Sequence, residues 1–287
     1  MKNLNQYITE YIIKKKLDNP IDSEDHYDYH PESKEELVEN IKELIDKGIY
    51  NFNCINTIKI TDMSKLFEDL IVEKNFDVSK WDVSNVKDMS YMFLNCKNFD
   101  CDLSKWDVSS VEDMSRMFIY CIKFTGQGLE NWDVSNVTNM MSMFGACEKF
   151  EGKGLENWNV HNVENMQHMF SNCDNFKGKV IENWDVSNVT NMMSMFFQCI
   201  NLDCDLSKWD VRNVEYMNYM FQYCENFNGD LSKWDVRNVK RMILMFDGCE
   251  KFEGKGLENW NVSNVKDMHY MFNGCTALIN TPTWYKK

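Results

Sequence analysis

Eight tryptophans recur along this 287-residue chain at intervals of 25 or 26 residues, and this period limits the folds that the chain can adopt. They are Trp81, Trp106, Trp132, Trp158, Trp184, Trp209, Trp234 and Trp260. A fixed period in this range indicates one supersecondary unit per repeat, which cannot bury its apolar side alone, so that successive units stack into a solenoid. The same repeat explains the 11 Cys and 20 Met, because both residue types recur in each unit.

Within a unit the spacing of apolar residues changes from one period to another. One copy contains Leu103, Trp106, Val108, Val111, Met114, Met117, Phe118 and Cys121. The alternation up to Val108 predicts a short strand, and the i, i+3, i+4 and i+7 spacing from Met114 to Cys121 predicts one or two helical turns. We therefore expect an α/β repeat solenoid of about 9 or 10 turns, with short parallel strands and short helical turns.

The repeated string resembles that of a known family. Residues 132–147 read WDVSNVTNMMSMFGAC, and their pattern WDVSNVxxMxxMFxxC is similar to the BspA-like leucine-rich repeats of bacterial surface antigens, lipoproteins and phage proteins. The match extends from about residue 50 to 280. The resemblance implies a leucine-rich-repeat-like solenoid used in protein-protein interaction or adhesion.

Residues 1–48 are expected to form a separate helical segment that caps the solenoid of residues 49–287. A first amphipathic helix is indicated by the spacing of apolar residues from Leu4 to Ile12. A second is expected to begin at Ser33 and end near Gly48. Because solenoids need a cap to stay soluble, the second helix should cover the first coil. The thinner carboxyl end suggests end-to-end self-association.

No targeting segment is apparent in the sequence. The first residues lack the long apolar stretch and small-residue cleavage site of a secretory signal, and no stretch approaches the length of a membrane span. We therefore expect synthesis in the cytoplasm. The sequence leaves two settings open, a protein carried on a virion or cell surface and an intracellular, phage-encoded binder or inhibitor of a host protein.

The net charge argues against nucleic acid as the partner. The chain has 31 Lys and Arg against 45 Asp and Glu, which gives a formal charge of −14. A general phosphate-binding surface needs the opposite sign. A protein or a glycan is the expected partner.

Three polar or sulfur-containing columns recur with the repeat and are expected to be structural. The cysteines of the column that includes Cys121 and Cys147 are interpreted as reduced core thiols. Asparagines such as Asn136 and Asn162 are expected to satisfy backbone groups of the turns. The aspartate ladder that includes Asp107 is expected to be neutralised by neighbouring lysines rather than to bind calcium.

Two groups of histidines are weak candidates for chemistry. His26, Asp28 and His30 alternate near the amino end, and His161, Glu164 and His168 fall within one repeat. A metal-dependent enzyme would need the first group, because residues repeated in every unit are better explained by architecture. We expect no enzyme, no cofactor and no metal.

Binding is expected to depend on surface residues that differ between repeats. Aromatic and arginine side chains dominate protein interfaces. Tyr216, Tyr219 and Tyr223 follow each other at helical spacing. The predicted interaction patch consists of Phe197, Arg212, Tyr216, Tyr219, Tyr223 and Arg237.

Overall fold

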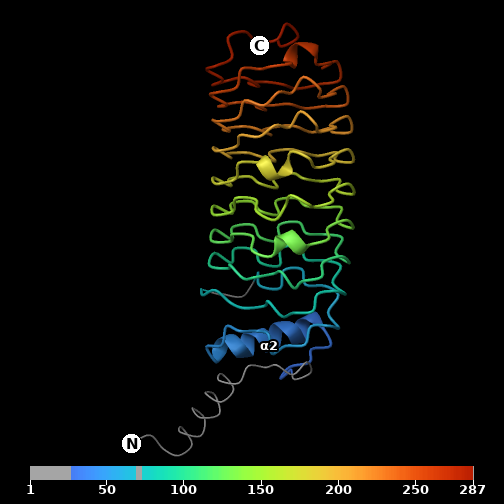
Figure 1. Ribbon diagram of the computed structural model, residues 1–287, viewed down its shortest axis with the longest axis vertical. Coiled ribbons are helices and arrows are strands. Elements are labelled where there is room, and N and C mark those ends of the chain that lie inside the picture. The colour runs from blue at the N-terminus through green and yellow to red at the C-terminus, as the bar shows by residue number, and fades with distance from the viewer. Residues whose placement is uncertain (1–26, 69–72, 287) are drawn as a thin grey trace, which may run out of the picture.

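The computed structural model describes residues 27–68 and 73–286 as a stack of coils along one axis (Figure 1). Helix α2 (Lys34–Asp46) lies across the amino-terminal end of the stack, and the carboxyl end lies at the opposite end. The coils also contain three short 3-10 helices, η1 (Leu129–Asn131), η2 (Lys179–Ile181) and η3 (Leu257–Asn259). Within these two ranges β-pairing is limited to isolated bridges. The expected helix from Leu4 to Ile12 lies outside the described residues.

Helix α2 forms where the sequence predicts the second helix. The Ser33 side chain accepts a hydrogen bond from the N–H of Glu36 (3.2 Å), which caps the first turn. One face, formed by Leu37, Ile41 and Leu44, is buried against the first coil. The Lys34 ammonium contacts Asp62 in that coil at 3.2 Å. The helix therefore covers the apolar interior at this end, as a cap does.

Each coil is a series of four-residue turns whose first and last residues are buried. In one coil such turns, each closed by a main-chain hydrogen bond, join Leu103 with Trp106, Val108 with Val111, Met114 with Met117 and Phe118 with Cys121. The two ends of a β-turn lie close together, so both can face the interior. The apolar residues at the two ends of each turn therefore line the core without any helix.

Main-chain hydrogen bonds between coils run along the stack. Alternate N–H groups donate to carbonyl groups of the next coil, as in Met114 to Asn139 (3.0 Å), Arg116 to Met141 (2.7 Å), Phe118 to Met143 (2.9 Å) and Tyr120 to Gly145 (2.8 Å). Parallel bridges such as that between Asp113 and Asn139 mark the same register. The pairing is parallel, as the repeat predicts, but no bridge extends into a strand.

The expected strands and helical turns are wrong in their local conformation. The segment from Leu103 to Val108 is a turn, and the segment from Met114 to Cys121 is a pair of turns. Arg116 and Tyr120 have φ values of 57° and 63°, which an α-helix excludes and which the third position of a type II turn requires. The leucine-rich-repeat-like class stays a prediction.

Side chains of one type stack on each other through the core. The indole rings of Trp106, Trp132 and Trp158 are almost parallel, with centroids 6.3 and 6.1 Å apart. Phe118 and Phe144 stack in the same way at 5.8 Å. Each of these tryptophans donates its indole N–H to a carbonyl of the preceding coil, at 2.9 Å from Trp158 to Leu129. The interior thus contains stacked aromatic rings, and no buried side-chain nitrogen or oxygen of the described residues lacks a hydrogen-bond partner.

The cysteines of the repeat are free thiols in this core. Cys147 donates its S–H to the carbonyl of Phe118 at 3.1 Å, and Cys173 donates to that of Phe144 at 3.0 Å. Burial raises the pKa of Cys173 to about 12 and that of Cys96 to about 12. A thiol in this setting serves as a small core residue and a hydrogen-bond donor, because it does not ionise near neutral pH.

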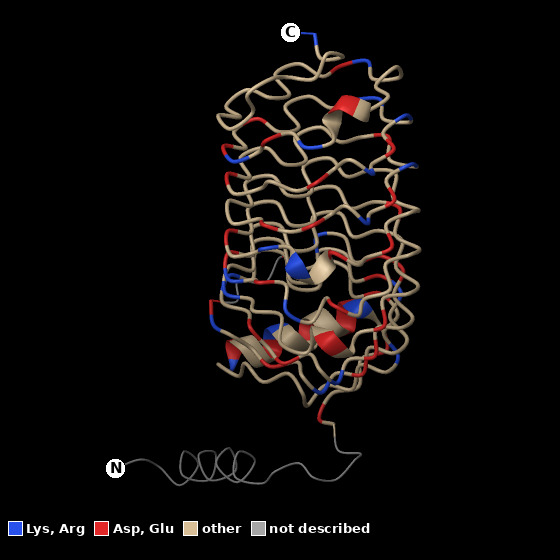
Figure 2. Ribbon diagram, turned by 45° about the horizontal axis from the view of Figure 1, so that its top comes forward, with Lys and Arg blue, Asp and Glu red and all other residues tan. Residues whose placement is uncertain are grey.

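Acidic and basic residues are distributed along the whole stack (Figure 2). In the part of the chain that the structure describes, no helix has the length and apolar character needed to cross a bilayer.

Replacing a core tryptophan tests the contribution of the indole hydrogen bonds. Trp158→Phe removes the donor to Leu129 and leaves space beside the ring. We expect it to lower the free energy of unfolding by about 1–3 kcal/mol. Urea unfolding followed by circular dichroism measures the change. The control is Asn157→Ala, which alters an exposed neighbour. Equal midpoints for the two variants would contradict a stabilising role of the ladder.

The buried thiols predict a loss of stability in base. Because the folded pKa is raised, the unfolded state loses thiol protons first, from about pH 8.5 upward. The contribution of each buried thiol to the free energy of unfolding should be fully present below that pH. It should fall as pH rises toward 12, by about 1.4 kcal/mol per pH unit for each thiol. The urea midpoint should drop between about pH 8 and 10. In the double variant Cys147→Ala, Cys173→Ala the slope should be shallower; an unchanged slope contradicts the explanation.

Candidate binding face

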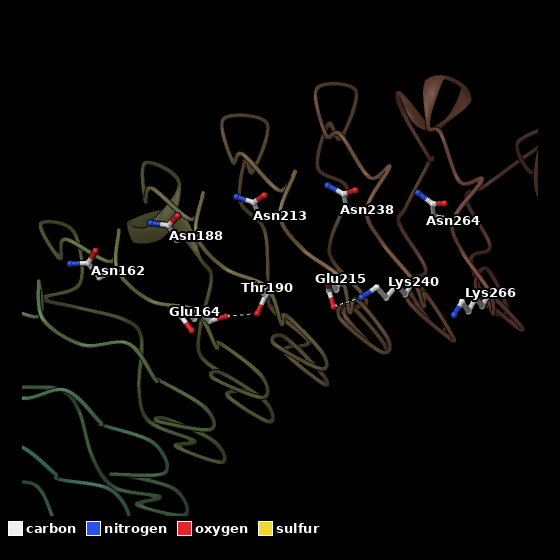
Figure 3. Close-up of a pocket in the computed structure, with 10 residues that line it drawn as sticks. All are labelled: Asn162, Glu164, Asn188, Thr190, Asn213, Glu215, Asn238, Lys240, Asn264 and Lys266. Atoms are coloured by element: carbon white, nitrogen blue, oxygen red, sulfur yellow. Dashed lines mark hydrogen bonds and ion pairs between the residues drawn. The ribbon is translucent and has the colours of Figure 1, made fainter.

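An open groove of about 900 Å³ runs along the outer surface of five coils. Two parallel columns line it (Figure 3). The amide column consists of Asn162, Asn188, Asn213, Asn238 and Asn264, and the mixed column consists of Glu164, Thr190, Glu215, Lys240 and Lys266. Members of the two columns are two positions apart in the sequence, with a valine between them, as in Asn188, Val189 and Thr190.

The amide column uses only its nitrogen atoms to stabilise the fold. Each of these asparagines donates its Nδ2–H to a main-chain carbonyl of the preceding coil, at 2.6–2.8 Å. The predicted scaffold role of the asparagines is therefore confirmed. Their Oδ1 atoms accept no hydrogen bond within residues 27–68 and 73–286, so each asparagine of the groove lining keeps an unused acceptor. These acceptors repeat once per coil, at about 4.8 Å.

The mixed column carries both signs of charge. The ammonium group of Lys240 pairs with Glu215 at 2.6 Å, which raises the pKa of Lys240. Thr190 donates its hydroxyl to the carbonyl of Glu164 at 3.2 Å. Lys266 makes no ion pair with any described residue. Two carboxylates and two ammonium groups leave the groove polar and without net charge.

The predicted interaction patch does not form one cluster. The rings of Phe197 and Tyr223 meet edge to face with centroids 6.0 Å apart. Tyr216 instead lies under the Lys240 ammonium, 5.9 Å from it. Tyr219 is half-buried, whereas Tyr216 and Tyr223 are 37% and 42% exposed. The helical spacing that grouped the three tyrosines does not apply, because the segment is a pair of turns.

The two arginines of the predicted patch each form an ion pair within their own coil. Arg212 pairs with Asp210 and Arg237 with Asp235, both at 2.9 Å. No ion pair or ring contact joins either arginine to the tyrosines in the described part of the chain. A binding role for the six residues stays a prediction.

The aspartate ladder forms turns and is not neutralised by the lysine column. Asp107 accepts the N–H of Ser109 at 3.1 Å, and Asp133 accepts that of Ser135 at 3.0 Å. This is an Asx-turn, in which the carboxylate replaces a backbone acceptor. The hydrogen bonds from Ser135 lower the pKa of Asp133. Among the described residues, the lysines Lys80, Lys105 and Lys233 make no ion pair, so the expectation of charge pairing with them is wrong.

The histidine candidates are not arranged as metal sites. His161 contacts Asp185 at 2.8 Å through Nδ1. His168 lies in another turn, half-buried. His26 lies outside the described residues. Within the described ranges no three His, Cys, Asp or Glu side chains are placed to bind one ion.

Sequence reasoning missed the groove. The asparagine column was expected to be scaffold only, and the mixed column beside it was not predicted. A signal was present, because Asn and the residue two positions later share a side of an extended chain. The residue at that later position varies among Glu, Thr and Lys, as in Glu164, Thr190 and Lys240, while the asparagine recurs.

Comparisons with known proteins give a family and little more. The sequence profile described as "Mycoplasma protein of unknown function, DUF285" matches residues 34–153, 138–255 and 168–284. The search of curated proteins found no significant match. Among solved structures, "Crystal structure of TLR13-ssRNA13 complex" matches with a TM-score of 0.20 and 10% identity, over 86% of this chain and 51% of that chain. The chain thus spans about half of that protein, and so weak a likeness carries no argument. The BspA-like attribution stays a prediction.

A natural interruption of the asparagine column provides a test of its stabilising role. Ser110 stands where the neighbouring coils have asparagine. Ser110→Asn should add a hydrogen bond to the preceding coil and raise the free energy of unfolding by about 0.5–1.5 kcal/mol. Asn213→Ala, which removes the bond to Ser187, should lower it by a similar amount. Urea midpoints that move in any other direction would contradict the role.

Proposed function

We propose that the chain, which belongs to the family described as "Mycoplasma protein of unknown function, DUF285", is a non-enzymatic binding scaffold. In this proposal the stacked coils form a repeat solenoid with the groove as its binding face. The partner is a protein or a glycan that lies along the stack. Adhesion is one use of such a surface.

The observation that carries this proposal is the row of amide oxygens in the groove. The oxygens of Asn188, Asn213 and Asn238 accept no hydrogen bond from described residues, whereas their nitrogens donate to main-chain carbonyls of the preceding coil. The groove therefore presents acceptors at a regular spacing next to hydroxyl, carboxylate and ammonium groups. Hydroxyl or amide donors on an extended ligand match such a row.

The charges of the groove favour a neutral or mixed-charge partner. Glu215 and Lys240 neutralise each other at 2.6 Å, so the middle of the groove has no field that would select a polyanion. The net charge of −14 acts against nucleic acid in the same way. Sugar hydroxyls and peptide amides satisfy both conditions.

The core argues against chemistry by the repeated cysteines. Burial raises the pKa of thiols such as Cys96 and Cys173 to about 12, which removes the thiolate that a nucleophile needs. In the proposed scaffold these cysteines therefore serve the core and supply no nucleophile.

The column of free thiols from Cys96 to Cys275 also favours one setting over the other. A core of unpaired cysteines suits a reducing compartment during folding. This supports the alternative of an intracellular binder or inhibitor of a host protein. Display on a virion after cytoplasmic folding is compatible with the same thiols.

A bulky residue placed in the groove tests its role in binding. Thr190 lies midway along the mixed column and is exposed. Thr190→Trp should weaken binding to any ligand of the groove about tenfold or more, because the indole occupies the space. The probes are an array of immobilised glycans and an array of purified cell-surface and cytoplasmic host proteins, with affinities measured by biolayer interferometry.

The matched control is Thr138→Trp. Thr138 lies in the same column, and its hydroxyl also contacts a glutamate carbonyl of the preceding coil. It does not line the groove. Thr138→Trp should bind like the wild-type protein. Equal affinities for the two variants would place binding elsewhere, and no wild-type binding to either array would contradict the proposed partner classes.

A further inference from the structure

Arg212 and Arg237 occupy the same position in neighbouring coils. Each is a middle residue of a four-residue turn that is closed by a 3.0 Å main-chain hydrogen bond between its two buried valines. Asn238, which directly follows Arg237, donates its Nδ2–H to the carbonyl of Arg212 at 2.7 Å. This bond fixes one turn on the other, so the main chains of the two arginines lie about 4.8 Å apart.

The two guanidinium groups are held in the same way by their own turns. Nε of Arg212 donates to Oδ1 of Asp210, and Nε of Arg237 donates to Oδ1 of Asp235, both at 2.9 Å. The same carboxylate oxygens also accept the main-chain N–H groups of the two arginines, at 3.2 and 3.3 Å. Because both contacts repeat, the guanidinium groups are related by the repeat of the stack and lie side by side.

Other coils show that this turn does not need an arginine. Ser84 and Ser109 stand at the same position, and their hydroxyl groups donate to Asp82 and Asp107 at 2.6 Å. The arginine Nε thus takes the place of a serine hydroxyl. What arginine adds is its two terminal amino groups, which donate to no acceptor among the described residues. These groups are the part that a ligand can use.

The local charge favours a ligand group with a single negative charge. Arg212 and Arg237 are balanced by Asp210 and Asp235, and the two arginine side chains are 67% and 66% exposed. A dianion would meet the two aspartates without a net positive charge to offset their repulsion. A carboxylate carries one charge and two oxygens, and each oxygen can accept from one guanidinium.

The arginine pair lies beside the amide column of the groove. Asn213 and Asn238 directly follow the two arginines in the sequence and line the groove. Their Oδ1 atoms accept no hydrogen bond from described residues. Donors next to acceptors match a ligand that carries a carboxylate beside several hydroxyl groups, as a sugar acid does. A peptide main chain offers only one N–H donor per residue.

We propose that Arg212 and Arg237 bind the carboxylate of an acidic sugar, a uronate, at the edge of the groove. One carboxylate oxygen accepts from each guanidinium, and ring hydroxyls donate to the amide oxygens of Asn213 and Asn238. Because the aspartates hold the guanidinium groups in place, less entropy is lost on binding. The uronate site rests on the proposed function, since it names the class of glycan that the groove binds.

NMR of the full-length protein tests the uronate site. The probes are methyl glucuronide, methyl glucoside and a glutamate blocked at both main-chain ends, at equal ionic strength. The Nε–Hε resonances of Arg212 and Arg237 report on the carboxylate, and the side-chain amides of Asn213 and Asn238 report on the hydroxyl groups. Glucuronide should move all four resonances, and glucoside should leave the arginine resonances unchanged. Blocked glutamate should bind about five- to tenfold more weakly than glucuronide, because it lacks the hydroxyl groups.

Serine variants separate binding from folding. The double variant Arg212→Ser, Arg237→Ser places in both turns the residue found at Ser84 and Ser109, so its urea midpoint should equal that of the wild type. Its affinity for glucuronide, measured from the side-chain amide resonances of the groove, should fall about tenfold or more. The control is Arg116→Gln, which removes a positive charge from a coil that does not line the groove and should bind like the wild type.

Thr190→Trp distinguishes a failure of the arginine pair from a failure of the groove. In this variant blocked glutamate should still move the arginine resonances, whereas the preference for glucuronide should shrink. A preference that stays intact would contradict the groove while leaving the arginine pair as a carboxylate site.

Three results would overturn the uronate site. The first is arginine resonances that respond to glucoside or to none of the probes. The second is a blocked glutamate that binds as tightly as glucuronide, which would assign the arginine pair to an acidic peptide. The third is an unchanged affinity for glucuronide in the folded double serine variant.

Discussion

The structure depends on main-chain hydrogen bonds between coils, which are made possible by left-handed residues. At Arg116 and Tyr120 a positive φ turns the chain so that alternate N–H groups point to the next coil. Non-glycine residues adopt this conformation at an energetic cost of about 1–2 kcal/mol each. Stacking offsets that cost, because every added coil satisfies the row of donors before it and extends the aromatic core.

The sequence was sufficient for the columns and insufficient for the conformation between them. The tryptophan period placed Trp158 and Cys147 in the core, and the spacing around Ser33 located helix α2. The prediction of helical turns failed from Met114 to Cys121, because the two ends of a β-turn share the i, i+3 spacing of a helix. The same wrong helical conformation grouped Tyr216, Tyr219 and Tyr223 on one face. The groove could have been found from the residues two positions after each asparagine.

The outer surface can vary because the core columns and the outer columns have different structural roles. Core columns repeat because each side chain contacts its copies in the coils on both sides. Outer columns lack that constraint, so Thr190 or Arg116 can differ from its neighbours without disturbing the stack. One outer column keeps an asparagine nitrogen for the fold and leaves its oxygen to the surface. Recognition can therefore diversify by single substitutions along a rigid frame.

The direction of the hydrogen bonds between coils has a mechanical consequence. Bonds such as that from Phe118 to Met143 lie along the length of the rod. A force that pulls its two ends apart therefore opens the bonds of one coil at a time and does not shear many together. Since each coil contacts only its neighbours, the chain would lengthen in steps of one repeat. The stack resists force least along its own axis. A copy that is held at both ends would therefore unfold coil by coil under tension, while the remaining coils stay folded.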